Sequence, residues 1–121
     1  MNSRKKELKL VNLIKNYSGL YNDANVEKYI QNIHSELEEL KEEVIKGHFD
    51  YIEDEMCDVM LQTIMLFEKV KYTYGIKPDR MYRKLLTKYK HRAPHLFQHQ
   101  KLSFFDENKY WIQAKKTEVK K

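Results

Sequence analysis

The fold is decided by three short stretches: Glu36-Leu-Glu-Glu39, the turn sequence Lys46-Gly47-His48, and Glu55-Met-Cys-Asp58. The two acidic pairs stand at equal distances on either side of Gly47, a residue type that often follows a helix because it tolerates a left-handed backbone. Residues three apart in a helix lie on the same face. If the turn joins two antiparallel helices, Glu39 therefore faces Glu55, and Glu36 faces Asp58.

The residues around these acids predict an antiparallel helix hairpin. The first arm carries an apolar stripe at helical spacing, with the acids along its shoulder. That stripe consists of Val26, Ile30, Ile33, Leu37, Leu40 and Val44. The second arm is apolar almost all round from Met56 to Phe67, which is typical of a helix in the middle of a bundle. Its polar stripe is Glu55, Asp58 and Gln62, and we expect Cys57 to fill a small packing slot.

Four carboxylates that meet where water is scarce predict a metal site. Clustered anions repel one another and raise each other's pKa unless a cation lies among them. Inward-facing carboxylates on facing helices are a known way to hold metals in a helical bundle. An all-oxygen set from Glu36, Glu39, Glu55 and Asp58 suits a hard ion, Mg²⁺ or Mn²⁺. The other acids of the hairpin, Glu38, Glu42 and Glu53, are expected to be solvated.

The whole chain predicts one all-α domain over residues 1–121. Its 121 residues include 41% hydrophobic residues, with only 3 Gly and 2 Pro to interrupt helical periodicity. We expect a helical bundle of four to five helices with a central antiparallel helix hairpin. The expected helices cover residues 2–17, from 23 or 25 to 47, 50–75, 78–93 and 106–119, with an irregular arm over 93–105. The inner face of the first is expected to be Leu10, Leu13, Ile14 and Tyr17, and the apolar anchor of the last Tyr110, Trp111 and Ala114.

Composition limits the partners and the compartment. No apolar run approaches the roughly 18 residues of a membrane span, and no signal-peptide pattern opens the chain. With one cysteine and therefore no internal disulfide, a cytoplasmic location is expected. The formal net charge is +5, but the 18 acids are interspersed with the bases, so a nucleic-acid partner is not favoured. The histidines His91, His95 and His99 match no structural zinc spacing.

These motifs resemble those of the MazG-type nucleoside triphosphate pyrophosphohydrolases, within the all-α NTP pyrophosphohydrolase group. The acidic pairs match the family's Glu-x-x-Glu and Glu-x-x-Asp, including the apolar run after Asp58. Downstream, the segment from Lys88 to Phe97 is similar to the family's basic motif, and the tail with Tyr110-Trp111 is similar to its closing helix. The stretch from Ser18 to Val26 lacks the Cys-Pro-Trp-Asp signature of many members, which leaves base and sugar preference open.

The resemblance implies metal-dependent hydrolysis of nucleoside or deoxynucleoside triphosphates to a monophosphate and pyrophosphate. It implies that Glu36, Glu39, Glu55 and Asp58 hold Mg²⁺ or Mn²⁺, and that Glu39 takes a proton from water. Positive charge on the leaving pyrophosphate side would come from basic side chains. The candidates for that role are Lys88 and Arg92, followed by Lys84.

Other readings remain open at this point. A dUTP or dCTP pyrophosphatase, or a phosphoribosyl-ATP pyrophosphohydrolase, has a similar fold and similar acidic motifs. A helical module without catalytic activity, which binds nucleic acid through its basic tail, would instead show salt-sensitive binding. We also expect a homo-oligomer, a dimer or higher, because the apolar girth of the second hairpin arm is hard to cover in a monomer and because the family tends to dimerise.

Overall fold

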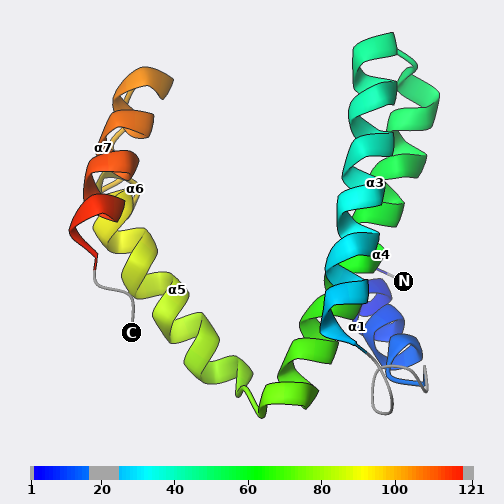
Figure 1. Ribbon diagram of the computed structural model, residues 1–121. Helices are drawn as coiled ribbons and strands as arrows, with labels where there is room; N and C mark the ends of the chain where they lie inside the picture. The colour runs from blue at the N-terminus through cyan, green and yellow to red at the C-terminus, as the bar shows by residue number, and fades with distance from the viewer. Residues whose placement is uncertain (1, 17–24, 119–121) are drawn as a thin grey trace. The chain divides into compact units, whose positions relative to one another are not determined.

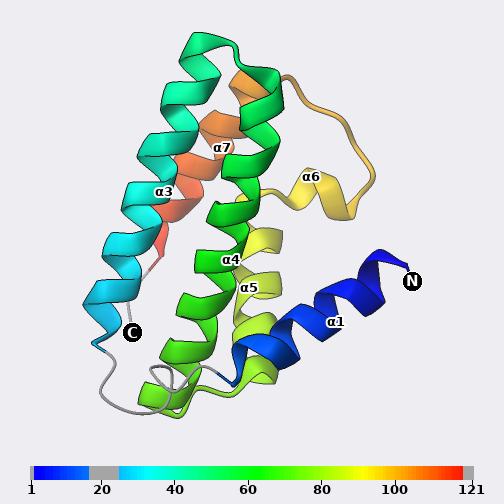
Figure 2. The same cartoon turned by 90° about the vertical axis from the view of Figure 1, so that its right-hand side faces the viewer.

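The computed structural model describes residues 2–16 and 25–118, and every regular element in these residues is an α-helix. Figures 1 and 2 show the helices from two sides. They are α1 (Ser3–Ile14), α3 (Val26–Lys46), α4 (Phe49–Tyr74), α5 (Pro78–Arg92), α6 (Pro94–Phe97) and α7 (Phe104–Thr117). The all-α prediction is confirmed. None of these helices is both long enough and apolar enough to span a lipid bilayer.

The chain forms two compact units, Met1–Ile76 and Lys77–Lys121. The first unit is built on α3 and α4, which run antiparallel and side by side in both views (Figures 1 and 2). Gly47 ends α3 in the left-handed region at φ 72°, and its backbone N–H donates to Glu43 and Val44 carbonyls. The predicted hairpin and its turn are therefore confirmed. The expectation of a single domain over residues 1–121 stays a prediction.

The beginnings of the two hairpin helices differ in how they are capped. Asn25 caps α3 by accepting a hydrogen bond from the Glu27 N–H at 2.8 Å, as one of the two predicted caps; the other, Asp23, lies outside the described residues. Helix α4 begins at Phe49, one residue before the predicted start at residue 50. The turn is so short that His48 becomes the N-cap directly after the Gly47 cap of α3.

Packing along the hairpin fixes which residues face one another. Ile14 of α1, which is 2% exposed, packs with Tyr29 of α3 and Met65 of α4 in one hydrophobic cluster. Tyr29 and Met65 are equidistant from Gly47, as are Glu39 and Glu55, so one antiparallel register runs the length of the pair. We call the line where α3 and α4 face each other the seam. Of the predicted inner face of α1, Leu10 and Ile14 pack on this cluster, Leu13 is 54% exposed, and Tyr17 lies outside the described residues.

Helix α4 is not covered on all sides in the chain on its own. Met56 is 44% exposed and Met60 is 53% exposed, and Cys57 is also exposed rather than filling a packing slot. The buried apolar positions of this helix are Val59 and Met65. Within the first unit, α4 packs mainly on α3, and Met56 and Met60 remain in solvent.

The second unit pairs α5 with α7. Pro78 occupies the first turn of α5, which begins where predicted, and Ser103 caps α7 by accepting from the Asp106 N–H at 3.2 Å. This cap starts α7 two residues earlier than predicted, at Phe104. The expected irregular arm over 93–105 also contains the short helix α6, which begins at Pro94. A proline ring sets the helical φ in advance, and this favours a first turn here.

Aromatic contacts hold the second unit together. The rings of Tyr89 on α5 and Trp111 on α7 meet edge to face with their centroids 6.1 Å apart, and Phe97 of α6 lies 6.0 Å from Tyr89. Of the predicted anchor of the last helix, Trp111 and Ala114 are half-buried, whereas Tyr110 is exposed. Leu85 and Leu86 of α5 are also exposed.

Replacing Gly47 by alanine should destabilise the first unit by about 1 kcal/mol, because a Cβ disfavours the left-handed backbone. A Cβ at this position meets no atom within 4 Å, so the loss comes from the backbone alone. Urea unfolding followed by circular dichroism measures it. Gly47→Asn is the control and should lose less, since asparagine tolerates this region. Equal stability of the alanine variant and the parent would contradict the turn geometry.

Candidate metal centre

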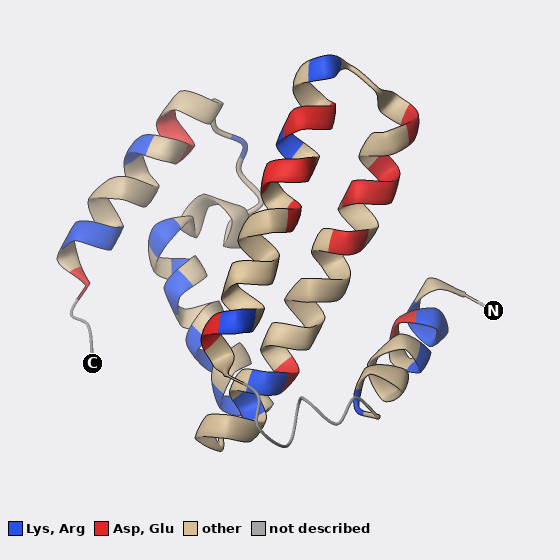
Figure 3. Cartoon of the chain, turned by 45° about the vertical axis from the view of Figure 1, so that its right-hand side comes forward, with Lys and Arg blue, Asp and Glu red and all other residues tan. Residues whose placement is uncertain are grey.

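The hairpin brings three of the four predicted acids together. Glu36 and Glu39 on α3 and Glu55 on α4 each offer a carboxylate oxygen, and these oxygens all lie within 4.8 Å of one another. Figure 3 shows acidic segments on both arms of the hairpin, toward its tip. Side chains from the two helices converge because the antiparallel register places each of these acids of α3 at the same height as an acid of α4. Oxygen atoms at such separations can share one cation.

Two oxygens of this cluster are buried without a hydrogen-bond partner. They are Oε2 of Glu36 and Oε2 of Glu55, one from each helix. A buried carboxylate oxygen without a donor is costly, and a bound cation is a common reason for one. The three carboxylates therefore fit a hard divalent ion in two ways. They supply oxygen ligands, and two of their buried oxygens have no hydrogen-bond donor.

The acids also make one another less acidic. Burial raises the pKa of the Glu36 carboxyl, and a hydrogen bond with Glu39 and the negative charges of Glu39, Asp58 and Glu55 raise it further. Burial likewise raises the pKa of Glu55, followed by the charges of Glu39 and Asp58. Holding several negative charges here is thus unfavourable without a counterion, and a divalent cation would reverse that balance.

Asp58 stands slightly apart from the other three. Its side chain is exposed and it is not among the carboxylates within 4.8 Å, yet its charge acts on both Glu36 and Glu55. Its position one turn along α4 from Glu55 faces the same cluster. The assignment of all four residues as metal ligands stays a prediction. Among them, Asp58 is the residue that is least closely grouped with the others.

The neighbouring acids separate into two groups. Glu38, Glu42 and Glu53 are exposed, as expected for solvated residues. Glu43 is half-buried, and its carboxylate bonds the His48 ring at 2.9 Å, while its charge contributes to the raised pKa of Glu55. Sequence spacing placed Glu43 on the shoulder of the apolar stripe but gave no sign of the contact with His48 across the turn.

Comparison with known protein families assigns the chain to one of them. The family model for the MazG nucleotide pyrophosphohydrolase domain matches residues 24–97. The chain belongs to this family. The MazG match contains both acidic pairs and the basic segment of α5, whereas α7 lies beyond it.

A solved structure supports the assignment over a longer range. The MazG chain is similar to a mazG-related protein from Thermotoga maritima, with a TM-score of 0.76 and 25% sequence identity. The similarity covers 93% of this chain and 99% of that one. A comparison with curated proteins found no match.

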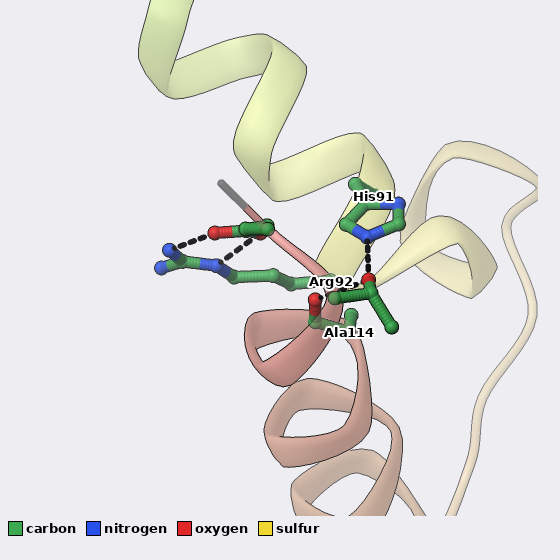
Figure 4. A network of polar contacts seen from close by, with 5 residues as sticks. His91, Arg92 and Ala114 are labelled. Carbon is green, nitrogen blue, oxygen red and sulfur yellow. Dashed lines mark hydrogen bonds and ion pairs between the residues drawn. The ribbon is translucent and has the colours of Figure 1, made fainter. Parts of the chain in front are cut away.

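In the second unit of the MazG chain, the predicted phosphate-binding residues differ in what they contact. Arg92 donates from Nε and Nη2 to the two carboxylate oxygens of Glu118, at 2.9 and 2.7 Å. Its guanidinium also lies 5.0 Å from the centroid of the Trp111 ring. Lys84 and Lys88 are exposed. Figure 4 shows the hydrogen bonds of Arg92 with Glu118 and that of His91 with Thr117.

The Arg92 to Glu118 pair joins α5 to the end of α7, and sequence reasoning missed it. The hydrogen bond with Arg92 lowers the pKa of Glu118, and the charges of Arg92, His91 and Lys88 lower it further. The hydrogen bond with Glu118 in turn raises the pKa of Arg92. These partners are 26 residues apart, so no local pattern in the sequence indicates the pair.

The side chain of His95, in the basic segment, is buried and held by contacts within the second unit. It is 5% exposed, and its Nε2 lies 2.7 Å from the Glu107 carboxylate of α7. It lines a pocket of about 290 Å³ together with Tyr89 and Trp111. His95 therefore links α6 to α7 within the second unit.

Replacing Glu36 by glutamine should stabilise the metal-free protein at pH 7.5. The folded-state pKa of Glu36 is raised, so the folded state binds its proton more tightly than the unfolded chain, and stability falls as the pH rises through that pKa. Removing the charge removes this loss. Thermal unfolding in chelator between pH 5 and 8 measures the effect, and the variant should gain most at the high end. Glu38→Gln, at an exposed position, is the control and should track the parent.

Replacing Glu118 by glutamine should destabilise the protein at pH 7, and the difference should vanish in acid. The folded-state pKa of Glu118 is lowered, so its stabilising effect is present above the unfolded pKa and is lost as the pH falls through the folded one. A series of thermal melts at falling pH measures it. Asp79→Asn is the control, because the Asp79 to Arg83 pair is exposed and contributes little. A parent and variant that differ equally at every pH would refute the ion pair.

Proposed function

We propose that this MazG chain is a metal-dependent nucleoside triphosphate pyrophosphohydrolase, which cleaves between the α and β phosphates to give a monophosphate and pyrophosphate. Membership of the MazG nucleotide pyrophosphohydrolase domain family supports this reaction class. The observation that carries it to named residues is the convergence of Glu36, Glu39 and Glu55 with two buried oxygens that have no donor.

The acids hold the metal in this proposal. Glu36, Glu39, Glu55 and Asp58 are the ligands, and their oxygen chemistry favours Mg²⁺, with Mn²⁺ as an alternative. When bound, such an ion would offset the charge of the polyphosphate and make a nearby water more acidic. The buried oxygens of Glu36 and Glu55 are suited to holding it, since they are positioned by two packed helices rather than by a loop.

Glu39 is the proposed proton acceptor. Its side chain is exposed, whereas Glu36 and Glu55 are half-buried, so water reaches Glu39 most easily among the three clustered acids. A carboxylate within reach of the attacking water can take its proton as the bond to phosphorus forms. Glu39 also belongs to the cluster, which keeps the accepted proton near the reacting atoms.

The basic residues of α5 are proposed to bind the phosphates. Lys84 and Lys88 are exposed and can turn toward an anion. Arg92 uses two of its five N–H donors on Glu118, which leaves three for a phosphate oxygen. A guanidinium already fixed by a carboxylate and an indole ring loses little side-chain entropy when it binds a second anion.

The chain is also proposed to form a homo-oligomer, a dimer or higher. The exposed apolar residues of the hairpin support it, since a large apolar surface on a soluble protein commonly marks an interaction site. These residues are Leu37, Val44, Ile45, Phe49, Met56 and Met60. A second copy with the same hairpin is a partner of matching chemistry.

Pyrophosphate release from the common ribo- and deoxyribonucleoside triphosphates tests the proposal. With Mg²⁺ the parent should turn over at least one of them, and chelator should abolish the activity. Glu39→Gln and Asp58→Asn should lose on the order of a hundredfold or more in kcat, as expected for groups that act on a proton transfer or hold a metal. Glu38→Gln and Glu42→Gln are matched controls at exposed positions of α3 and should retain full activity.

Each negative outcome has a separate meaning. No pyrophosphate from any triphosphate would refute the reaction. Turnover that survives in both Glu39→Gln and Asp58→Asn would leave the reaction in place and refute the site.

A further inference from the structure

Gln62 continues the seam of the hairpin directly below the acids. Along α4, the residues Glu55, Asp58, Gln62 and Met65 follow one another at spacings of three and four, which keeps them on one helix face. Met65 is buried in the hydrophobic cluster. By the register that places Tyr29 with Met65, the residue opposite Gln62 is Asn32, which is half-buried. The amide side chains of Gln62 and Asn32 therefore lie between the acids and the apolar core.

The amide of Gln62 has a buried oxygen without a partner. Its Oε1 is shielded from water and accepts no hydrogen bond within the described part of the chain. Nearly all buried polar atoms in proteins find a partner, so such an atom calls for an explanation. Ionised carboxylates above it can only accept, and the methionine below it offers no donor. Asn32 opposite carries an amide donor, yet Oε1 of Gln62 accepts no hydrogen bond from it, so a ligand hydroxyl would supply the missing donor.

The position of Gln62 matches one part of the proposed substrate. It lies four residues from Asp58, about 6 Å along the helix axis. In a nucleoside triphosphate the sugar is attached directly to the α-phosphate, so a sugar that extends from the acids along the seam would lie within one such step. The sugar carries hydroxyl groups, which donate to an amide oxygen. Gln62 as a whole is half-buried while its Oε1 is covered, so the amide has to turn toward the ligand for the hydrogen bond to form.

We propose that the amide oxygen of Gln62 accepts a hydrogen bond from a sugar hydroxyl of the bound nucleotide, which makes Gln62 a specificity-determining residue. This inference rests on the proposed function, since it uses the acids as the site of the phosphates. It assigns recognition of the sugar to the same hairpin that holds the metal. A nucleotide without the hydroxyl leaves the buried oxygen unpaired, and a site built in this way discriminates against it.

Sugar discrimination in Gln62→Met tests the inference. Methionine has a similar length and shape but no amide. For the base that the parent turns over fastest, kcat/KM is measured with the ribose, 2′-deoxyribose and 2′,3′-dideoxyribose triphosphates. The parent should prefer the sugars with hydroxyls. The variant should lose about two- to tenfold on those substrates, the size of one neutral hydrogen bond, and should be unchanged on the dideoxy compound.

Two controls separate recognition from folding. Gln31→Met makes the same chemical change at an exposed glutamine of α3 and should keep the parental discrimination. The unfolding temperature of metal-free Gln62→Met should be at or above that of the parent, because the change removes an unpaired buried oxygen. Gln62→Leu, assayed in parallel, provides a second variant without an amide.

The outcomes distinguish a failure of this inference from a failure of the proposed function on which it rests. A parent that hydrolyses no triphosphate overturns the proposed function and the inference with it. A parent that hydrolyses triphosphates, beside folded Gln62 variants that discriminate among the sugars as the parent does, overturns the inference alone. An equal loss on all three sugars has the same meaning, since it assigns Gln62 a structural role.

Discussion

The antiparallel register of α3 on α4 is the constraint on which the rest of the first unit depends. It is held at one end by the turn at Gly47 and toward the other by the hydrophobic cluster that contains Tyr29 and Met65. Because both helices keep the same spacing from the turn, every pair of seam residues equidistant from Gly47 lies at one height. Glu39 and Glu55 meet for the same reason that Tyr29 and Met65 do.

The seam changes character along its length. Near the turn it carries the acids, then the amides of Asn32 and Gln62, and then the apolar cluster that also receives Ile14 of α1. The apolar end supplies the stability that comes from burial. The acidic end opposes it, because burial raises the pKa of both Glu36 and Glu55. A hairpin anchored at one end can therefore hold an electrostatically unfavourable cluster at the other.

The sequence predicted those features that depend on spacing within one hairpin. Glu36, Glu39 and Glu55 could be brought together on paper, because helical periodicity and a glycine turn determine their positions. Periodicity does not say how many neighbours cover a helix, so Cys57 of α4 was expected to fill a packing slot and is exposed. The contact of Arg92 with Glu118 joins residues far apart in the chain, and it depends on how α7 packs on α5. Only the folded structure contains that information.

The open surroundings of Gly47 have a consequence for how such hairpins can vary in length. No atom approaches the position where its Cβ would lie, and Phe49 just beyond the turn is 81% exposed. Extra residues inserted at this tip would extend into solvent and leave the facing pairs undisturbed. One residue inserted between Glu55 and Asp58 would instead rotate the remainder of α4 by about 100° and separate the acids. Natural variation in this hairpin should accordingly be concentrated at its tip, with the intervals inside each acidic pair kept constant.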